Sequence, residues 1–233
     1  MKLPNRARQA GFTLVEIAIV LVIIGVLLVG VLQGQEMIEN SKTKSIVNSM
    51  KGIQAGYNGY LDRYQTIPGD ETAATMTARG WPGATGGVAN GVLAIAPATA
   101  FTNGAAEGPG FWRAMRASGL LSGNPIVTAA NYLANLPRHS GGGLLAVTVG
   151  APTVFGLSGT FVCASGLTTK QASAIDILID GPLPANNIGN NVGNLRAAFG
   201  AVNPLVLTAP APGGAAYNEL NVTDPWTACM KIG

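Results

Sequence analysis

The sequence predicts an α+β protein in which one long N-terminal helix packs on a small antiparallel sheet. Three observations favour this class. Residues 12–32 are almost uninterruptedly apolar, residues 46–64 repeat apolar side chains every three or four positions, and short β-branched segments bounded by glycine follow Pro125. The first two patterns are typical of helices and the third is typical of strands.

The apolar segment is long enough to cross a membrane. From Ile17 to Leu32 no residue is charged or strongly polar. A helix over residues 12–32 would be about 31 Å long, which matches the hydrocarbon core of a bilayer. The preceding residues include Lys2, Arg6 and Arg8 but no acid. This charge bias predicts that the leader stays in the cytoplasm and that the chain after Leu32 is exported.

Glu16 is the exception in this segment, because a carboxylate in an apolar span costs a few kcal/mol unless it has a partner. Cleavage between Gly11 and Phe12 would create an α-amine one helical turn before Glu16. The amine at Phe12 of one copy would then neutralise Glu16 of a neighbouring copy. The alternative is an ordinary signal-anchor in which Glu16 lies near the membrane interface, either solvated or protonated.

The basic leader, Gly11, the sequence FTLVE over residues 12–16 and the apolar run resemble the class III signal of type IV pilins and pseudopilins. The resemblance implies cleavage after Gly11 by prepilin peptidase, N-methylation of Phe12 and assembly of copies into a helical filament. It also implies that Glu16 registers one subunit on the next, and that the fold is type IV pilin-like. A secretory signal fits less well, because the apolar run is longer than a typical h-region and no A-x-A box follows it.

The domain organisation follows from these patterns. We expect a cleaved leader over residues 1–11, a transmembrane and filament-core helix over 12–35, an amphipathic helix half over 36–66 and a globular domain over 67–233. No proline occurs between Pro4 and Pro68, so a single helix from Phe12 to about Gln65 would be roughly 80 Å long. Its second half should bury a stripe formed by Ile46, Met50, Ile53, Tyr57, Tyr60, Leu61 and Tyr64.

Composition argues against nucleic acid as a partner. Only 11% of the residues are charged. Lys2, Arg6 and Arg8 lie in the leader, and the rest of the chain has equal numbers of basic and acidic residues. No Lys/Arg cluster remains to follow a phosphate backbone. So few charges suit a subunit whose surface is covered by copies of itself.

The two cysteines, Cys163 and Cys229, fall in the part expected to be exported, where disulfides persist, so we expect them to pair. A metal site would need more soft ligands than these and the single histidine, His139, provide. The tail over residues 186–233 is rich in Asn, Pro and Gly, and would be loose without this bridge. It resembles the disulfide-bounded, surface-exposed C-terminal region of many type IV pilins.

Within the globular domain, the Pro-Gly pair at residues 68–69 should end the long helix. The segment YQTIPGD over residues 64–70 resembles a passage in a subgroup of prepilin-like proteins. In this chain we expect it to be either a docking loop for the next subunit or a plain helix terminator. Residues 110–121 predict a short helix with Arg113 and Arg116 facing outward. The expected strands are Leu144–Val149, Thr153–Leu157, Thr160–Cys163 and Ala174–Ile179.

Asp176 and Asp180 are the candidate metal ligands, because their segment resembles one with paired aspartates in the same prepilin-like subgroup. Two carboxylates with main-chain carbonyls suit calcium, which some pseudopilins bind. The favoured interpretation is a strand that ends in a turn capped by Asp180, without a metal or other cofactor. No nucleophile motif surrounds His139, so we expect a loop histidine rather than a catalytic base.

These observations predict a structural protein rather than an enzyme, since the sequence contains no recognisable nucleophile–base pair or convincing carboxylate pair. The expected partners are further copies of the chain, prepilin peptidase and an assembly platform in the inner membrane. The precursor would lie in the inner membrane with its globular domain in the periplasm, and would assemble into an extracellular pilus. The alternatives are a type II secretion pseudopilin in the periplasm, or a minor tip pilin that acts as an adhesin.

Overall fold

The computed structural model describes residues 11, 13–81, 86–102, 107–150, 156–182, 193–199 and 225–233. The chain divides into two compact units, Met1–Ser41 and Lys42–Gly233. One helix, α1 (Leu14–Tyr64), contributes residues to both units and has 51 residues. Its bounds lie within two residues of the expected helix, because the chain offers no proline over this stretch.

In the first unit, α1 is apolar on every side. All side chains from Leu14 to Leu32 are exposed, and none of the most apolar window is buried. By length and composition this is the one described helix that could cross a membrane. A helix that is hydrophobic all round requires an apolar environment or other helices around it.

In the second unit, α1 is amphipathic and supplies one side of the core. Ile46, Met50 and Tyr60 have no exposed surface, and Ile53 and Tyr57 are also buried. Leu61 and Tyr64 are half-buried against the same core. The stripe predicted from the spacing of apolar residues is therefore confirmed.

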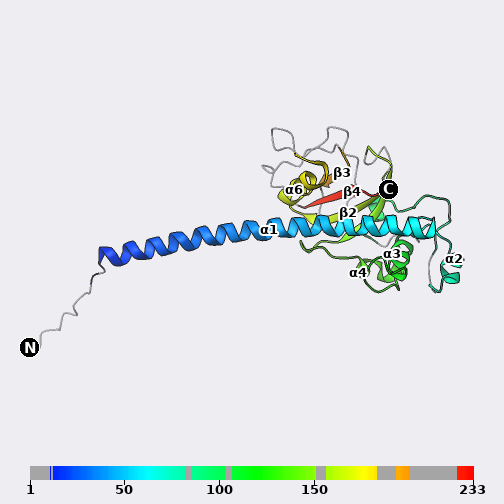
Figure 1. Ribbon diagram of the computed structural model, residues 1–233, viewed down its shortest axis with the longest axis horizontal. Coiled ribbons are helices and arrows are strands. Elements are labelled where there is room, and N and C mark those ends of the chain that lie inside the picture. The colour runs from blue at the N-terminus through cyan, green and yellow to red at the C-terminus, as the bar shows by residue number, and fades with distance from the viewer. Residues whose placement is uncertain are drawn as a thin grey trace, which may run out of the picture. The chain divides into compact units, whose positions relative to one another are not determined.

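The sheet has four antiparallel strands in the order β1-β2-β4-β3 (Figure 1). Strands β1 and β2 correspond to two of the expected strands, whereas β4, which is the last strand in sequence, lies between β2 and β3. The register places Cys163 of β2 opposite Cys229 of β4, and the two cysteines form a disulfide. The strands are β1 (Leu145–Gly150), β2 (Gly159–Leu167), β3 (Leu195–Phe199) and β4 (Trp226–Lys231).

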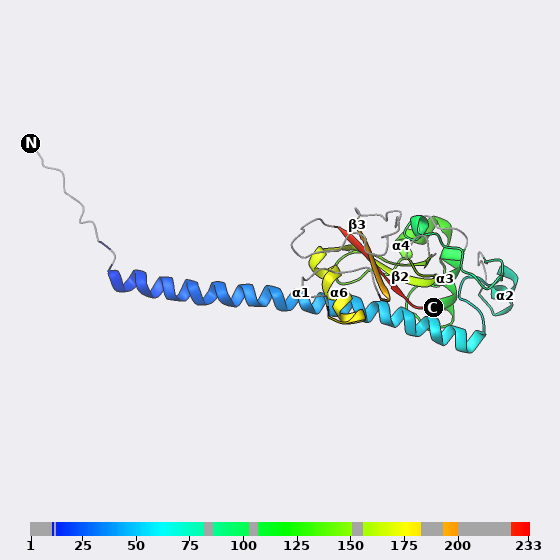
Figure 2. The ribbon, with the colours of Figure 1, turned by 90° about the horizontal axis from the view of Figure 1, so that it is seen from above.

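Helices cover the sheet and extend the core. Helix α6 (Thr169–Asp180) lies beside β3 and β4 (Figure 2), and the indole Nε1 of Trp226 donates a hydrogen bond of 3.0 Å to Thr169 Oγ1. Helix α3 (Glu107–Ala117) packs on α1 through the rings of Phe111 and Tyr57, whose centroids are 6.5 Å apart. The short elements are α2 (Ala73–Ala78), η1 (Pro97–Thr99), η2 (Ala129–Asn131) and α4 (Tyr132–Asn135).

The expected strand Ala174–Ile179 is wrong, because these residues belong to α6. Thr168 caps the helix by accepting a hydrogen bond from Gln171 N, and the Gln171 side chain accepts one from Thr168 N. Gly181 ends the helix with a φ of 102°. The alternating segment IDILID fits a strand as well as a helix, and this reciprocal cap at its start decides the outcome.

The C-terminal tail, expected to be loose without the disulfide, carries that disulfide at Cys229, and its described residues also form two strands that the sequence did not predict. Residues 195–199 and 226–231 form β3 and β4, and the buried side chains of β4 include Trp226 and Met230. Both segments are short, and their only β-branched residue is Thr227, so neither shows the β-branched composition typical of a strand. Of the expected strand Thr153–Leu157, residues 153–155 lie outside the described part of the chain, and Gly156 and Leu157 form a bend.

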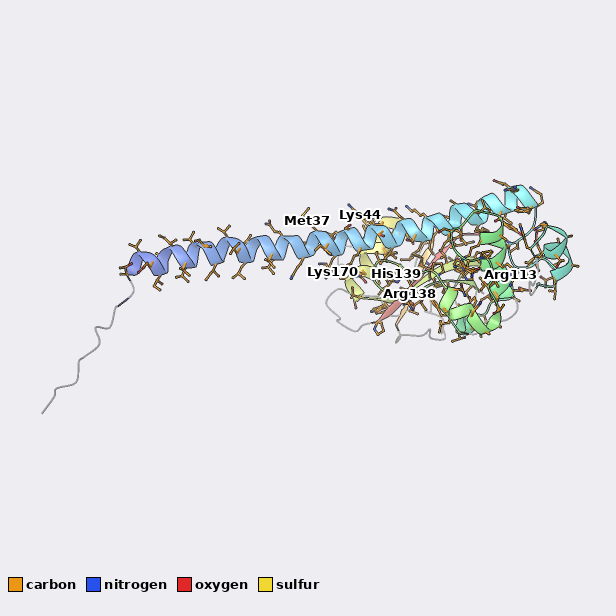
Figure 3. The ribbon with its side chains drawn as sticks, turned by 90° about the horizontal axis from the view of Figure 1, so that it is seen from below. Met37, Lys44, Arg113, Arg138, His139 and Lys170 are labelled. Atoms are coloured by element: carbon orange, nitrogen blue, oxygen red, sulfur yellow. A yellow bond between two sulfur atoms is a disulfide. The ribbon has the colours of Figure 1, made fainter. Side chains whose placement is uncertain are left out.

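The expected outward direction of Arg113 is wrong as well. Its side chain in α3 is 3% exposed, and Nη2 donates a hydrogen bond of 2.9 Å to the carbonyl oxygen of Val127. Arg116 is half-buried and donates to the carbonyl oxygens of Asn124 and Asn135. Both arginines therefore fasten α3 to the following loop, and Figure 3 shows Arg113 inside the globular unit. Burial lowers the pKa of both guanidinium groups.

Candidate functional site

The start of α1 is built by a reciprocal cap between Thr13 and Glu16. The Glu16 carboxylate oxygen Oε2 accepts hydrogen bonds from Thr13 N at 2.9 Å and from Thr13 Oγ1 at 2.8 Å. In return, Glu16 N donates to Thr13 Oγ1 at 3.3 Å. This is the capping-box arrangement, which satisfies main-chain donors that a helix start otherwise leaves unpaired.

This cap is a role for Glu16 that the sequence reasoning missed. The signal was present as Thr-x-x-Glu immediately before an apolar run, which is the pattern of a capping box. Only Oε2 is used in the cap, and Oε1 accepts no hydrogen bond from the residues that the structure describes. The carboxylate is therefore able to bind a second donor without losing the cap.

The remaining predicted processing residues lie just before this cap. Gly11 is exposed, and no described atom lies within 4 Å of the position that a Cβ would occupy there. Phe12 lies outside the described residues. Glu16 itself is exposed and is the only ionisable residue from Thr13 to Gly34. A carboxylate at the start of a fully apolar helix is the chemical feature that defines this site.

Comparison with known proteins adds one finding to this geometry. Residues 6–32 match a family model described as the prokaryotic N-terminal methylation motif. This motif is the prepilin signal of type IV pilins and pseudopilins. The long apolar N-terminal helix, the four-stranded antiparallel sheet and the disulfide in the C-terminal region fit the type IV pilin-like α+β fold. The motif supports a protein of the type IV pilin-like or pseudopilin class, which prepilin peptidase processes. No curated protein matches the chain.

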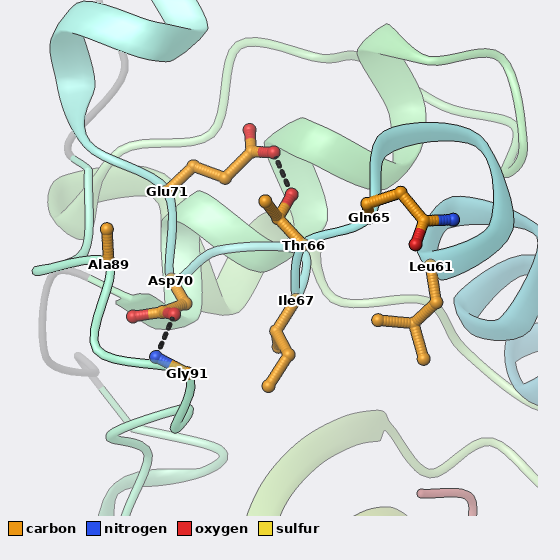
Figure 4. A pocket seen from close by; sticks show the side chains of 8 residues that line it. All are labelled: Leu61, Gln65, Thr66, Ile67, Asp70, Glu71, Ala89 and Gly91. Atoms are coloured by element: carbon orange, nitrogen blue, oxygen red, sulfur yellow. Dashed lines mark hydrogen bonds between the residues drawn. The ribbon is translucent and has the colours of Figure 1, made fainter.

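The segment that ends α1 forms a second polar site, shown in Figure 4. The Asp70 carboxylate accepts hydrogen bonds from the main-chain nitrogens of Asn90 at 3.0 Å and Gly91 at 2.7 Å. Asp70 is buried and lines a cavity of about 240 Å³ together with Gln65 and Glu71. These contacts tie the end of α1 to a loop twenty residues further along the chain.

Glu71 is buried beside Asp70 and is paired with a cation. Its carboxylate accepts hydrogen bonds from Arg79, from Thr66 and from the Tyr60 hydroxyl, the last at 2.9 Å. The Arg79 guanidinium also lies 4.4 Å from the centre of the Tyr64 ring. Burial, followed by the Glu71 charge, raises the pKa of Tyr60. These bonds give the YQTIPGD segment a structural role, and docking of a further subunit at this segment stays a prediction.

Asp176 and Asp180 do not form the turn that the sequence indicated, since both lie in α6. Asp176 is buried, whereas Asp180 ends the helix and accepts hydrogen bonds from Asn194 N at 2.9 Å and Leu195 N at 2.7 Å. Asp180 therefore holds the start of β3. Among the residues that the structure describes, no group of three His, Cys, Asp or Glu residues is placed to bind a metal ion.

Proposed function

We propose that this chain is a structural subunit of a type IV pilus-like filament. The observation on which the proposal depends is the fully exposed apolar half of α1, with a single carboxylate at its start. Such a surface is stable in a bilayer and, after assembly, among the same helices of other copies. The methylation motif on this segment supports the same interpretation.

Cleavage after Gly11 would place a new α-amine at Phe12, one residue before the capping threonine. The amine would be methylated and positively charged. It would bind Glu16 of a neighbouring copy through Oε1, while Oε2 keeps its bonds to Thr13. An ion pair in an apolar environment is strongly favoured over two separate charges, so it would set the register of one helix on the next.

In this proposal the precursor lies in the inner membrane through α1, and the unit from Lys42 onward lies in the periplasm. Prepilin peptidase and an inner-membrane assembly platform would be its partners before assembly. The disulfide between Cys163 and Cys229 suits this location, because disulfides persist in oxidising compartments. We infer a structural role rather than catalysis.

The first test is the mass of the mature chain from cells. A product that begins at N-methylated Phe12 would support processing, and a chain that retains Met1 would refute it. The second test is shearing of filaments from the cell surface. Abundant sheared protein is expected for a pilus, whereas processed protein that stays with the cells would indicate a periplasmic pseudopilus.

The variant Glu16→Gln tests the role of the carboxylate. It keeps a hydrogen-bond acceptor for the Thr13 cap but removes the charge, so we expect normal processing and at least a tenfold loss of sheared filaments. Glu36→Gln is the matched control, because Glu36 is an exposed carboxylate on the same helix outside the apolar run. Filaments of normal amount and length from the Glu16→Gln variant would contradict the proposed register.

A further inference from the structure

His139 is buried although it lies in a turn, and both of its ring nitrogens have partners. Its exposed fraction is 4%, Nε2 lies 2.8 Å from the carbonyl oxygen of Ser165, and Gly141 N donates to Nδ1 at 3.1 Å. A carbonyl accepts and an N–H donates, so the two contacts require a neutral ring with its proton on Nε2. The ring therefore joins Ser165 of β2 to Gly141 of the turn.

The same turn is fastened to α1 at the beginning of the second unit. Ser140 Oγ donates a hydrogen bond of 2.9 Å to the carbonyl oxygen of Lys42. The turn is closed by His139 N to Gly143 O at 3.1 Å and by Gly142 N to His139 O at 2.9 Å. The neutral ring therefore holds the turn by accepting the hydrogen bond from Gly141 N. The same turn binds α1 through Ser140, the residue before Gly141.

The charges near this turn are mostly positive. Arg138 precedes the turn, Lys42 and Lys44 lie on α1, and Lys170 is the second residue of α6. Figure 3 shows Lys44, Arg138 and Lys170 at the same end of the globular unit as His139. The carboxylates of α6 are Asp176 and Asp180, and on α1 Glu39 precedes Lys42 by about one turn. Ser165, the residue of β2 whose carbonyl oxygen binds the His139 ring, has no charge. Burial lowers the pKa of His139.

Protonation of this ring has a specific structural consequence. A second proton must sit on Nδ1, where Gly141 N–H already points, so two donors would face each other. The Gly141 bond must then break, because a protonated imidazole has no acceptor. The bond to Ser165 survives, since Nε2 donates in both states.

We propose that His139 is a pH-sensitive latch that holds the turn over residues 140–143 against α1 at Lys42, and that acidification releases it. The ligand of the switch is the proton. The inference does not depend on filament assembly, because every contact in it lies within one chain. In this proposal, the attachment of the turn to Lys42, the first residue of the second unit, depends on the pH of the surroundings.

The sign of the linked stability change follows from the direction of the shift. The folded ring has a pKa below its ordinary value of about 6.5, which the unfolded chain keeps. The unfolded state therefore binds more protons as the pH falls below about 6.5. The stabilisation is complete above that pH and is lost progressively between it and the lower pKa of the folded state.

The test uses NMR of the full chain in detergent micelles, with nitrogen-15 in the imidazole and the main chain. The sequence contains one histidine, so its ring signals need no assignment by mutation. We expect the Nε2–H form at pH 7 and a ring pKa below 6.5. The amide signals of Ser140–Gly143 should change with the same midpoint, with at least a tenfold loss of exchange protection at Gly141.

His139→Gln is the control variant, because its amide nitrogen can donate to Ser165 O but does not titrate. Its turn signals should stay constant between pH 4 and pH 7. A variant that fails to fold would not remove the test, since the wild-type titration decides by itself. A ring pKa of 6.5 or above, or turn signals that do not follow the ring, would overturn the latch.

Discussion

Gln65 follows the last residue of α1 and has a φ of 55°, in the left-handed region that costs a residue with a Cβ about 1 kcal/mol. Its main-chain nitrogen bonds to Leu61 O at 2.8 Å, so the backbone there ends the helix in the usual left-handed cap. Glycine is the residue best suited to this position. The sequence uses glutamine instead, and the next glycine, Gly69, lies beyond Pro68.

We therefore predict that Gln65→Gly raises the free energy of unfolding by about 0.5–1 kcal/mol. The matched control is Gln54→Gly, which places the same change in the helix interior and should cost about 1 kcal/mol. Urea unfolding of the two variants in micelles measures both. Destabilisation by Gln65→Gly would show that the side-chain bond from Gln65 to Asp62 O matters more than the strained backbone.

Gly69 allows the chain to approach α3 closely. It has a φ of 93°, and a Cβ at this position would stand 2.7 Å from Phe111 N and 2.8 Å from Glu107 O. Gly80 has a similar φ of 82°, but no described atom lies within 4 Å of its Cβ position. Alanine substitutions at Gly69 and Gly80 therefore separate the cost of backbone strain at positive φ from the cost of steric overlap.

We expect Gly80→Ala to cost about 1 kcal/mol from the backbone alone, and Gly69→Ala to cost about 3 kcal/mol or more. Thermal unfolding of the two variants side by side measures the difference. Equal costs would mean that α3 moves aside readily and that the contact at Gly69 contributes little.

At the scale of elements, capping residues at a helix end select helix over strand where the apolar periodicity fits both. In α1 the apolar pattern is continuous and the segment contains no proline, so its length was predictable from the sequence. In α6 the segment IDILID over residues 175–180, with Ile at every second position, fits both a strand and a helix. The cap formed by Thr168 and Gln171 selects the helix, and the motif Thr-x-x-Gln was available in the sequence.

The Thr13–Glu16 cap offers a test at the same scale. Thr13→Val keeps the shape of the side chain but removes its acceptor and donor, so the first turn of α1 should lose about 1 kcal/mol. In the unprocessed chain this corresponds to roughly fivefold faster amide exchange at the first helical residues. Thr13→Ser keeps the hydroxyl and should exchange like the wild type; equal rates in all three chains would contradict a cap.

At the scale of the whole molecule, the two central strands are joined covalently. The cysteines of β2 and β4 are separated by 66 residues. In the chain-entropy model, a loop of this length stabilises by about 4 kcal/mol. We expect the double variant with Cys163→Ser and Cys229→Ser to lose roughly this amount of unfolding free energy, measured in urea. Reduction of the wild-type disulfide should have the same effect. A loss below about 1 kcal/mol would show that strand pairing alone holds the sheet.

The N-terminal motif is easier to recognise in the sequence than the sheet, for a physical reason. The features of the N-terminal site lie within a few neighbouring residues, so Gly11, Phe12 and Glu16 are visible as one motif. Strand β4 owes its place to pairing with β2, which is distant in sequence, and its segment WTACMK has no strand signal of its own. The expected outward direction of Arg113 was wrong for the same reason, because the carbonyl oxygen of Val127 that it binds lies in a separate loop.

The position of β4 has a consequence for synthesis. Because a chain is synthesised from its N-terminus, β2 and β3 leave the ribosome before the strand that must lie between them. The sheet then stays incomplete until residue 231 has been synthesised. Chains that stop early would lack this central strand and would leave the facing edges of β2 and β3 unpaired.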